Sequence, residues 1–443
     1  MLSFRYLTRL LVAFFSRFKG LILVGVLGGI AIFILFNYIA PTIITTNTQI
    51  VGVSGRYHVE ELPEDILDMV GEGLTTLDDE GHPSPSLASS WETPDKGKTW
   101  IFTLNTDKLW HDKTNLTSSD IVYNFSDVEV ERPSDDKISF MLEEPYSPFP
   151  SVVSRPTFKQ GLIGTGRWRV DEISLAGTYV EKLTLILDEN TRKEKIIYRF
   201  YPTVEQTKLA YKLGEIDKIV NLLDPSPLDD WKVVNLETQL NKNLLVTIFF
   251  NNQDRLLSQK SARQALIYAL DKNSFDGERA ISPISSESWA HNPQVKKYTY
   301  DTQRAKELID GLPQELKEDL NIKLVSTPSL LGVAENVAQQ WREVGLETVV
   351  QVSSIVPEEY QAYITIFQLP KDPDQYALWH STQTATNISN YSNPRIDKLL
   401  EDGRVDLQQE ERYKIYLDFQ RFLLEDIPAG FLYYPNNYTV ERK

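Results

Sequence analysis

The chain has 443 residues, 41% of them hydrophobic and 24% charged, which is the composition of a folded globular protein with two or three packed units. The formal net charge of −16 at pH 7 argues against a nucleic-acid-binding protein, because phosphate binding requires a basic surface. The absence of cysteine excludes disulfides, thiolate metal sites, a cysteine nucleophile and a lipid-modified N-terminal cysteine.

An uncharged apolar run from Leu21 to Ala40 is the first feature along the chain, and it is long enough to span a bilayer as a helix. Four positive charges precede it, and no acidic residue occurs before Glu60. The positive-inside rule therefore places residues 1–20 in the cytoplasm and the chain after the run outside. A cleaved signal peptide is the alternative, but its apolar region would be shorter and a small-residue cleavage site would follow it. We therefore expect an uncleaved, single-pass transmembrane anchor.

The first half of the remaining chain is expected to be rich in strands. Residues 41–55 are polar and β-branched, and they are predicted to form a linker that leads into a first strand. The alternation in "TWIFTL" (99–104) predicts a strand, and the capping residues that open "TSSDIVYNF" (117–125) predict a helix. The segments 179–189 and 195–202 predict an antiparallel pair of strands. A helical pattern that Gly214 stops follows them, and then a short strand.

The continuous apolar run "LLVTIFFNN" (244–252) predicts a strand that is buried on both faces. Beyond it, longer helices alternate with short strands, which indicates an α/β unit. The chain ends in an aromatic strand (428–440) that could return to the first half. The predicted helices lie at 261–271, 301–310, 332–345 and 410–426, and the predicted strands at 321–327, 347–353 and 363–369.

The segment "GLTTLDDEGHPSPSLASSWETPDKGKTWIFTLNTDKLWHDKTNLTSSDIVYNF" (73–125) joins an opening Gly-Leu, a turn, a strand and a Trp-His-Asp turn in a specific order. The strongest similarity lies in "DPDQYALWHSTQTATNISNYSNPRIDKLLEDGR" (372–404) and "ERYKIYLDFQRFLLEDIPAGFLYYP" (411–435). These motifs resemble the family 5 extracellular solute-binding proteins, the dipeptide-, oligopeptide- and nickel-binding receptors of ABC importers. The resemblance covers nearly all of residues 50–443. It implies an α/β, two-lobed, type II periplasmic-binding-protein-like fold with the ligand enclosed between the lobes.

The resemblance and the change of pattern near residue 244 together predict how the chain is organised. The expected parts are a cytoplasmic basic segment (1–20), a transmembrane anchor (21–40), a linker (41–55), a first lobe (56–247 plus 428–443) and a second lobe (248–427).

The function implied by the resemblance is capture of a small ligand, with a peptide as the first choice, outside the cell membrane or in the periplasm. The ligand would then pass to ABC permease subunits. Two alternatives remain open: a receptor for an oligosaccharide or other neutral solute, and an anchored sensor or peptide chaperone without transport. We expect no enzymatic activity, no cofactor and no nucleic-acid partner.

The resemblance also implies where the ligand binds. Residues 73–75 resemble a segment that lines the cleft, where backbone groups could bind a ligand like an added strand; a plain strand end is the alternative. In peptide-binding members an aspartate three residues before the Asp-Pro pair binds the peptide's amino group, and Leu369 occupies that position here. Trp379 either borders the cleft or packs in the core. The implied ligand-binding residues are Gly73, Leu74, Thr75, Asn252, Gln368, Leu369, Asp372, Trp379 and Tyr391.

The run that begins at Asp372 also contains Asp374, His380 and Ser381, which could mimic a catalytic nucleophile and base. Adjacent residues point in different directions and no nucleophile-elbow motif surrounds them, so we expect turns rather than an active site. The five histidines are scattered without an i, i+4 pair, so no metal site is expected. The acidic run at 78–82 is predicted to be a solvated turn.

Overall fold

The computed structural model describes residues 14, 16–20, 23–30, 33, 46–189 and 192–443. Residues 16–20 and 23–30 are helical, and among the described residues no helix is long and apolar enough to cross a membrane. Much of the predicted anchor, namely residues 21–22, 31–32 and 34–40, lies outside the described residues. The anchor therefore stays a prediction.

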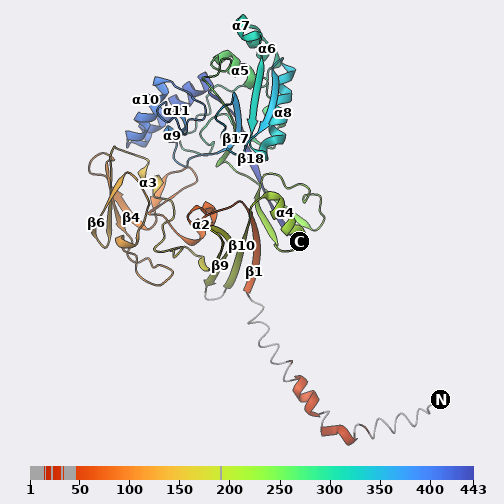
Figure 1. Ribbon diagram of the computed structural model, residues 1–443. Helices are drawn as coiled ribbons and strands as arrows, with labels where there is room; N and C mark the ends of the chain where they lie inside the picture. Colours follow the sequence, from red (N-terminus) through yellow and green to blue (C-terminus); the bar gives the residue numbers. More distant parts are fainter. Residues whose placement is uncertain (1–13, 15, 21–22, 31–32, 34–45, 190–191) are drawn as a thin grey trace, which may run out of the picture.

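The chain from Thr46 onward folds into two lobes that share one continuous sheet (Figure 1). Its order is β16-β15-β17-β13-β18-β11-β1-β10-β9-β8, and β12 and β14 also pair with β18. We call the part from β1 to β12 the first lobe and the part from β13 to α11 the second lobe, with β18 running through both. This architecture is the two-lobed α/β fold that the sequence predicts.

The first lobe is built around β1 (Thr46–Ser54), which pairs in parallel with a strand on each side. Residues 46–54 were predicted to belong to a linker, so this part of the prediction is wrong. Val51 and Val53 are buried under the helices of this lobe, and burial of alternate β-branched residues stabilises a strand. The other elements are η1 (Val59–Glu61), α2 (Glu64–Val70), β8 (Arg169–Ala176), β9 (Tyr179–Glu189), β10 (Arg192–Tyr201), α4 (Val204–Leu213), β11 (Lys218–Leu222) and β12 (Val234–Leu240).

Two predictions for this sheet are confirmed. Strands β9 and β10 form the expected antiparallel pair. Helix α4 ends where Gly214 adopts a φ of 79°, a left-handed conformation that glycine reaches without a steric cost, and β11 follows it.

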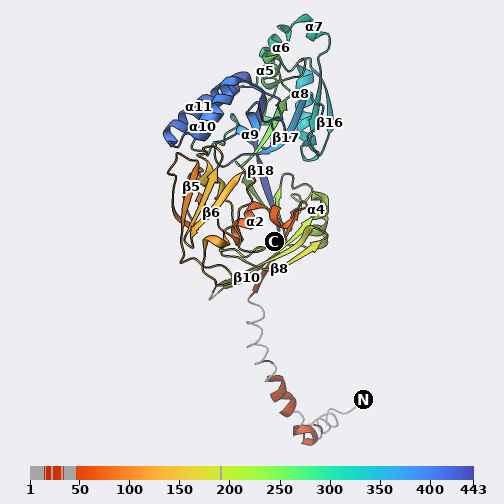
Figure 2. The ribbon, with the colours of Figure 1, turned by 60° about the vertical axis from the view of Figure 1, so that its left-hand side comes forward.

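A smaller antiparallel sheet, in the order β4-β5-β7-β6, completes the first lobe and lies below α10 and α11 in Figures 1 and 2. The predicted strand 99–104 is confirmed as β5, but only one turn of the helix predicted at 117–125 forms. The Thr157 hydroxyl accepts a hydrogen bond from the Val122 backbone N–H (3.2 Å) and donates one to its carbonyl (3.0 Å), so this backbone bonds to a neighbouring segment instead of a helix. The elements are β2 (Thr75–Leu77), β3 (Pro83–Pro85), β4 (Ala88–Glu92), β5 (Thr99–Leu104), η2 (Ser118–Asp120), β6 (Val128–Ser134), β7 (Lys137–Leu142) and α3 (Phe149–Val152).

The second lobe holds the largest hydrophobic core, and helices alternate with its strands as predicted. The predicted doubly buried strand is confirmed as β13 (Leu244–Phe250), in which every residue after Leu244 is buried. The other elements are α5 (Lys260–Tyr268), η3 (Lys272–Ser274), β14 (Gly277–Arg279), α6 (Thr302–Asp310), α7 (Gln314–Lys317), β15 (Asn321–Ser326), η4 (Pro328–Leu330), α8 (Leu331–Glu343), β16 (Glu347–Val352), β17 (Ala362–Gln368), α9 (Tyr376–Trp379), α10 (Pro394–Val405) and α11 (Gln409–Asp426).

Strand β18 (Ala429–Arg442) connects the lobes. Its first half pairs with β13, where Phe249 lies opposite Ala429, and its second half pairs with β11 and β12, where Ile219 lies opposite Val440. The strand predicted to return to the first half of the chain is therefore confirmed. The segment between β12 and β13 crosses at the same place, so two chain segments link the lobes, which is the arrangement that hinge closure requires.

Candidate ligand-binding site

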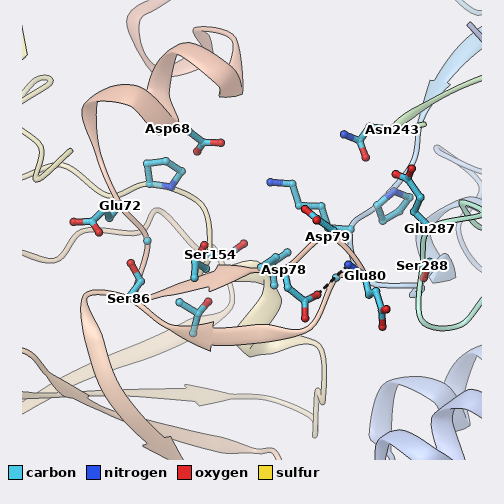
Figure 3. Close-up of a pocket in the computed structure, with 18 of the residues that line it drawn as sticks. Asp68, Glu72, Asp78, Asp79, Glu80, Ser86, Ser154, Asn243, Glu287 and Ser288 are labelled. Carbon is cyan, nitrogen blue, oxygen red and sulfur yellow. Dashed lines mark hydrogen bonds between the residues drawn. The ribbon is translucent and has the colours of Figure 1, made fainter. Parts of the chain in front are cut away.

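A cavity of about 1120 Å³ lies between the two lobes (Figure 3). The first lobe contributes the end of α2, the β2–β3 hairpin and the loop near Ser154, and the second lobe contributes residues 285–288 and 369–371. Asn243, from the segment that crosses between the lobes, lies in the same wall. The polar and charged side chains of the wall are Asp68, Glu72, Thr75, Thr76, Asp78, Asp79, Glu80, Ser86, Lys108, Ser154, Asn243, Ser285, Ser286, Glu287, Ser288 and Lys371.

The turn of the β2–β3 hairpin closes one side of this cavity. The Asp78 carboxylate accepts hydrogen bonds from the backbone N–H groups of His82 (2.8 Å) and Glu80 (3.0 Å), and its other oxygen lies 3.1 Å from the His82 ring. These interactions, chiefly the bond from the His82 backbone, hold the pKa of Asp78 below its usual value. The turn is therefore shaped by its own aspartate.

The same turn contacts the second lobe. Gly81 has a φ of +93°, and a Cβ atom there would lie 2.6 Å from the Lys371 carbonyl oxygen, so glycine permits both the turn and the contact. The Trp289 backbone N–H also donates to the Glu80 carbonyl at 3.1 Å. The acidic residues 78–80 are exposed, as predicted for a solvated turn, and because of these contacts the same turn also forms part of the cavity wall.

A second cavity, of about 410 Å³, adjoins the first, since the two share Ser154, Asn243 and residues 369–371. Its remaining wall includes Tyr146 and Arg155 of the first lobe and Gln368, Asp372 and Asp374 of the second.

The lobes also touch beyond this second cavity. The Tyr146 hydroxyl donates to the Asp374 carboxylate at 3.2 Å, and Arg404 lies 3.2 Å from the same carboxylate and 4.7 Å above the Tyr146 ring. The Ser147 backbone N–H donates to the Arg404 carbonyl at 2.7 Å. Burial is the main cause that raises the pKa of Asp374, and Arg404 opposes that shift. A buried, charge-assisted contact thus joins the lobes.

Five of the nine residues implied by the resemblance line these cavities. Gly73 and Thr75 lie in the wall of the larger one, Gln368 and Asp372 in that of the smaller one, and Leu369 in both. Asp372 is also a structural residue, because its carboxylate accepts two hydrogen bonds from Arg412, at 2.6 and 3.1 Å.

The other four lie inside the lobes and line neither cavity. Leu74 is fully buried in the core of the smaller sheet. Asn252 donates to the carbonyls of Phe250 and Ser389, and Tyr391 donates to Asp426 at 2.7 Å. Trp379 is fully buried and donates to Gln375 at 2.8 Å, so the core alternative describes its position. None of these four side chains belongs to the wall of either cavity.

The residues that could mimic a catalytic pair have separate partners. His380 Nδ1 lies 2.8 Å from the Thr382 hydroxyl and Nε2 lies 3.3 Å from Glu401, whereas the Ser381 hydroxyl donates to Asp397 at 2.7 Å. These contacts stabilise turns. In the described part of the chain, no group of three His, Asp or Glu side chains is arranged to hold a metal ion.

The sequence interpretation missed the carboxylates of the wall, among them Asp68 on α2 and Glu287. One signal was available, since the run of three acids at 78–80 is dense for a short hairpin turn. Nothing local indicates that Asp68 and Glu287 share one cavity.

Comparison with known proteins identifies relatives of this chain. A model of the bacterial extracellular solute-binding proteins, family 5 (middle region), matches residues 82–388. The oligopeptide-binding protein AppA of Bacillus subtilis is 24% identical over 459 aligned positions, which cover 87% of this chain and 84% of that protein. The dipeptide-binding protein of Escherichia coli is 22% identical, with 81% and 82% covered.

Solved structures show the same fold. The structure of NikZ from Campylobacter jejuni in complex with Ni(L-His) has a TM-score of 0.73 at 22% identity and covers 89% of this chain and 94% of that one. The structure of AppA from Bacillus subtilis in complex with a nonapeptide has a TM-score of 0.69 at 20% identity, with 90% and 95% covered. The chain belongs to family 5 of the bacterial extracellular solute-binding proteins.

Proposed function

We propose that this protein is the receptor of an ABC importer and that it captures a peptide between its lobes. The observation that supports this best is the cavity of about 1120 Å³, because its wall comes from both lobes and from the segment that crosses between them. A ligand that contacts both lobes favours the closed state over the open one, and closure is the signal that a receptor can present to a permease.

The character of the wall favours a peptide over a sugar. Hydroxyl, amide and carboxylate side chains predominate, and these pair with the backbone and side-chain groups of a peptide as well as with the hydroxyls of a sugar, so the choice between the two ligands depends on the other features of the wall. Among the described residues that line the larger cavity there is no aromatic ring, so a stacking platform for a sugar ring has no support there. The names of the oligopeptide- and dipeptide-binding relatives point in the same direction.

The proposed position of the ligand's amino group differs from that in the peptide-binding relatives. Leu369 lies where the resemblance implies an aspartate, and its side chain is only 5% exposed. A leucine cannot pair with an ammonium group, and an unpaired buried charge is costly. In this proposal, therefore, a carboxylate elsewhere in the wall binds the amino group.

The proposed location is the outer side of the cell membrane. Residues 21–40 would act as the anchor and residues 1–20 would remain in the cytoplasm, as the positive charges before the apolar run indicate. Residues 60–443 would face outward next to the permease. Because residues 1–59 carry five positive charges and no acid, the remainder has a formal charge of −21, which favours solubility.

Native mass spectrometry of the full-length protein in detergent, before and after mild unfolding, tests the proposal. We expect a peptide to be released. A released sugar or other neutral solute would move the assignment to the neutral-solute alternative. An empty protein that shows no thermal shift with peptide or sugar pools would contradict the receptor function. Loss of peptide uptake after gene deletion would distinguish an importer receptor from an anchored sensor or peptide chaperone.

A further inference from the structure

The cavity between the lobes has an unbalanced charge. Its wall carries six carboxylates and two lysines. Both lysines already have carboxylate partners, since Lys108 lies 2.5 Å from Glu72 and Lys371 lies 3.0 Å from Glu64. The positive charge of both wall lysines is therefore already engaged. Asp78 and Glu80 lie 3.1 and 3.8 Å from the His82 ring, and the carboxylates of the wall still outnumber its lysines. The six acids are Asp68, Glu72, Asp78, Asp79, Glu80 and Glu287.

Two of these acids have no side chain in direct polar contact within the described residues. Neither Asp68 nor Asp79 makes an ion pair or a side-chain hydrogen bond there, and Figure 3 shows Asp68 projecting from α2 toward the cavity. The pKa of Asp68 is raised, mainly by burial, while Lys371 lowers it and the neighbouring acids Glu64 and Asp65 raise it further. Asp68 is thus an exposed carboxylate in the cavity wall that has no cation in direct contact with it.

Closure of the lobes would increase the electrostatic repulsion between the acids of the first lobe and Glu287 of the second. The hairpin acids belong to the first lobe and Glu287 belongs to the second, and all of them line one cavity, as Figure 3 shows for Asp79, Glu80 and Glu287. Glu287 lies 3.5 Å from Lys242, but that lysine is shared with Glu278 at 3.4 Å. Like charges that approach each other repel, so a compensating positive charge between them favours the closed state.

We propose that the ligand is a cationic peptide whose positively charged group lies between the carboxylates of the hairpin turn, chiefly Asp79, and Glu287 of the second lobe. The inference rests on the proposed receptor function and adds the charge class of the ligand. In this arrangement the ligand's cation pairs with both lobes and removes the repulsion that opposes closure. Ligand charge and lobe closure are thereby linked, because the cation has its full set of partners only in the closed state.

Competition in native mass spectrometry tests this inference with the full-length protein in detergent. Three pools of pentapeptides share random neutral flanking residues and differ only in a central lysine, norleucine or glutamate. We expect the lysine pool to bind up to about fivefold better than the norleucine pool, as an exposed ion pair contributes, and the glutamate pool to bind least. High salt should reduce the difference.

Matched variants connect the preference to the wall. Asp79→Asn and Glu287→Gln replace exposed carboxylates, so the fold should be retained, and each should reduce the preference for lysine. Glu318→Gln is the control, because Glu318 is also exposed but lines neither cavity. A preference that survives both wall substitutions would overturn the assignment of these residues.

The outcomes distinguish this inference from the function on which it rests. If the norleucine or glutamate pool binds as well as the lysine pool, the receptor function stands and the charge inference is wrong. If spermidine binds and no peptide pool does, a cationic ligand is supported but the peptide is not. If none of these probes binds, both proposals are contradicted.

Discussion

Tyr146→Phe tests whether the contact between the lobes contributes to closure. The substitution removes the hydroxyl that donates to Asp374 at 3.2 Å but keeps the ring over which Arg404 lies at 4.7 Å. The change therefore isolates one hydrogen bond between a first-lobe and a second-lobe residue. Asp374 keeps Arg404 and the Tyr376 backbone N–H as partners, so the second lobe itself should remain folded.

The magnitude follows from the type of bond. A hydrogen bond to a charged group contributes about 1.5–3 kcal/mol, and a bond of 3.2 Å belongs at the lower end of that range. If the bond exists only when the lobes touch, its loss shifts the ratio of closed to open molecules by about tenfold toward the open state. When the empty protein is mostly open, the apparent Kd for the ligand rises by the same factor.

Single-molecule energy transfer between the lobes measures this shift directly. Because the chain has no cysteine, labels can be attached through Asp107→Cys in the first lobe and Glu318→Cys in the second, both at exposed positions. Tyr376→Phe is the matched control: its ring also lies against Arg404, at 4.4 Å, but its hydroxyl is 3.4 Å from Thr382 within the same lobe. The reasoning is refuted if Tyr146→Phe leaves the distribution unchanged, or if the control shifts it equally.

Three further predictions concern other parts of the fold. Gly81→Ala should weaken ligand binding, because the added Cβ would meet the Lys371 carbonyl of the opposing lobe. Gly345→Ala is the control: it has a similar φ of +92° but nothing within 4 Å of the added Cβ, so it should only lower stability. Isothermal titration measures the affinity and thermal melting measures the stability, and equal losses of affinity in the two variants would contradict the reasoning. Trp379→Ala should lower the free energy of unfolding in urea by about 3–5 kcal/mol, because the side chain is fully buried; an unchanged stability would contradict its place in the core. Burial lowers the pKa of Lys272 from its usual value to about 7, so the unfolded state binds more protons than the folded state between about pH 7 and 10. The free energy of unfolding should therefore rise with pH across that window, by up to about 1.4 kcal/mol per pH unit, and this group should not affect it at lower pH. Lys272→Met should remove this slope, and a slope retained in the variant would contradict the assignment.

The elements that were predicted correctly are specified by residues that are close together in the sequence. Strand β5 alternates buried and half-buried residues, β13 is apolar throughout, and α4 ends at a glycine with a left-handed backbone. Period and capping are local properties, so a single sequence is sufficient to read them. The family motifs likewise consist of short ordered stretches, so they predict the two-lobed fold from local sequence alone.

The errors occur where a distant segment competes with the local pattern. Residues 117–125 have a helix-start signal, but Thr157 bonds to the Val122 backbone instead. Residues 46–54 have the local pattern of a linker, but they form a strand that pairs with β10 and β11, which are more than a hundred residues away in the sequence. In both cases a long-range partner satisfies the backbone groups that the local pattern had assigned differently.

The candidate site likewise combines features that local sequence predicts with features that only long-range contacts produce. Motifs alone predicted that the ends of two segments, at Gly73 and Leu369, would face the ligand space, and both line the cavity. Only the tertiary structure placed Asp68, Asp79 and Glu287 in one wall and buried Trp379 in the core, because a cavity between lobes is made by residues that are hundreds of positions apart. The sequence by itself thus determined the family, the fold and the segments near the cavity. Folding decided the charge of the cavity, because charge at a site depends on which side chains meet there, and no local pattern encodes that.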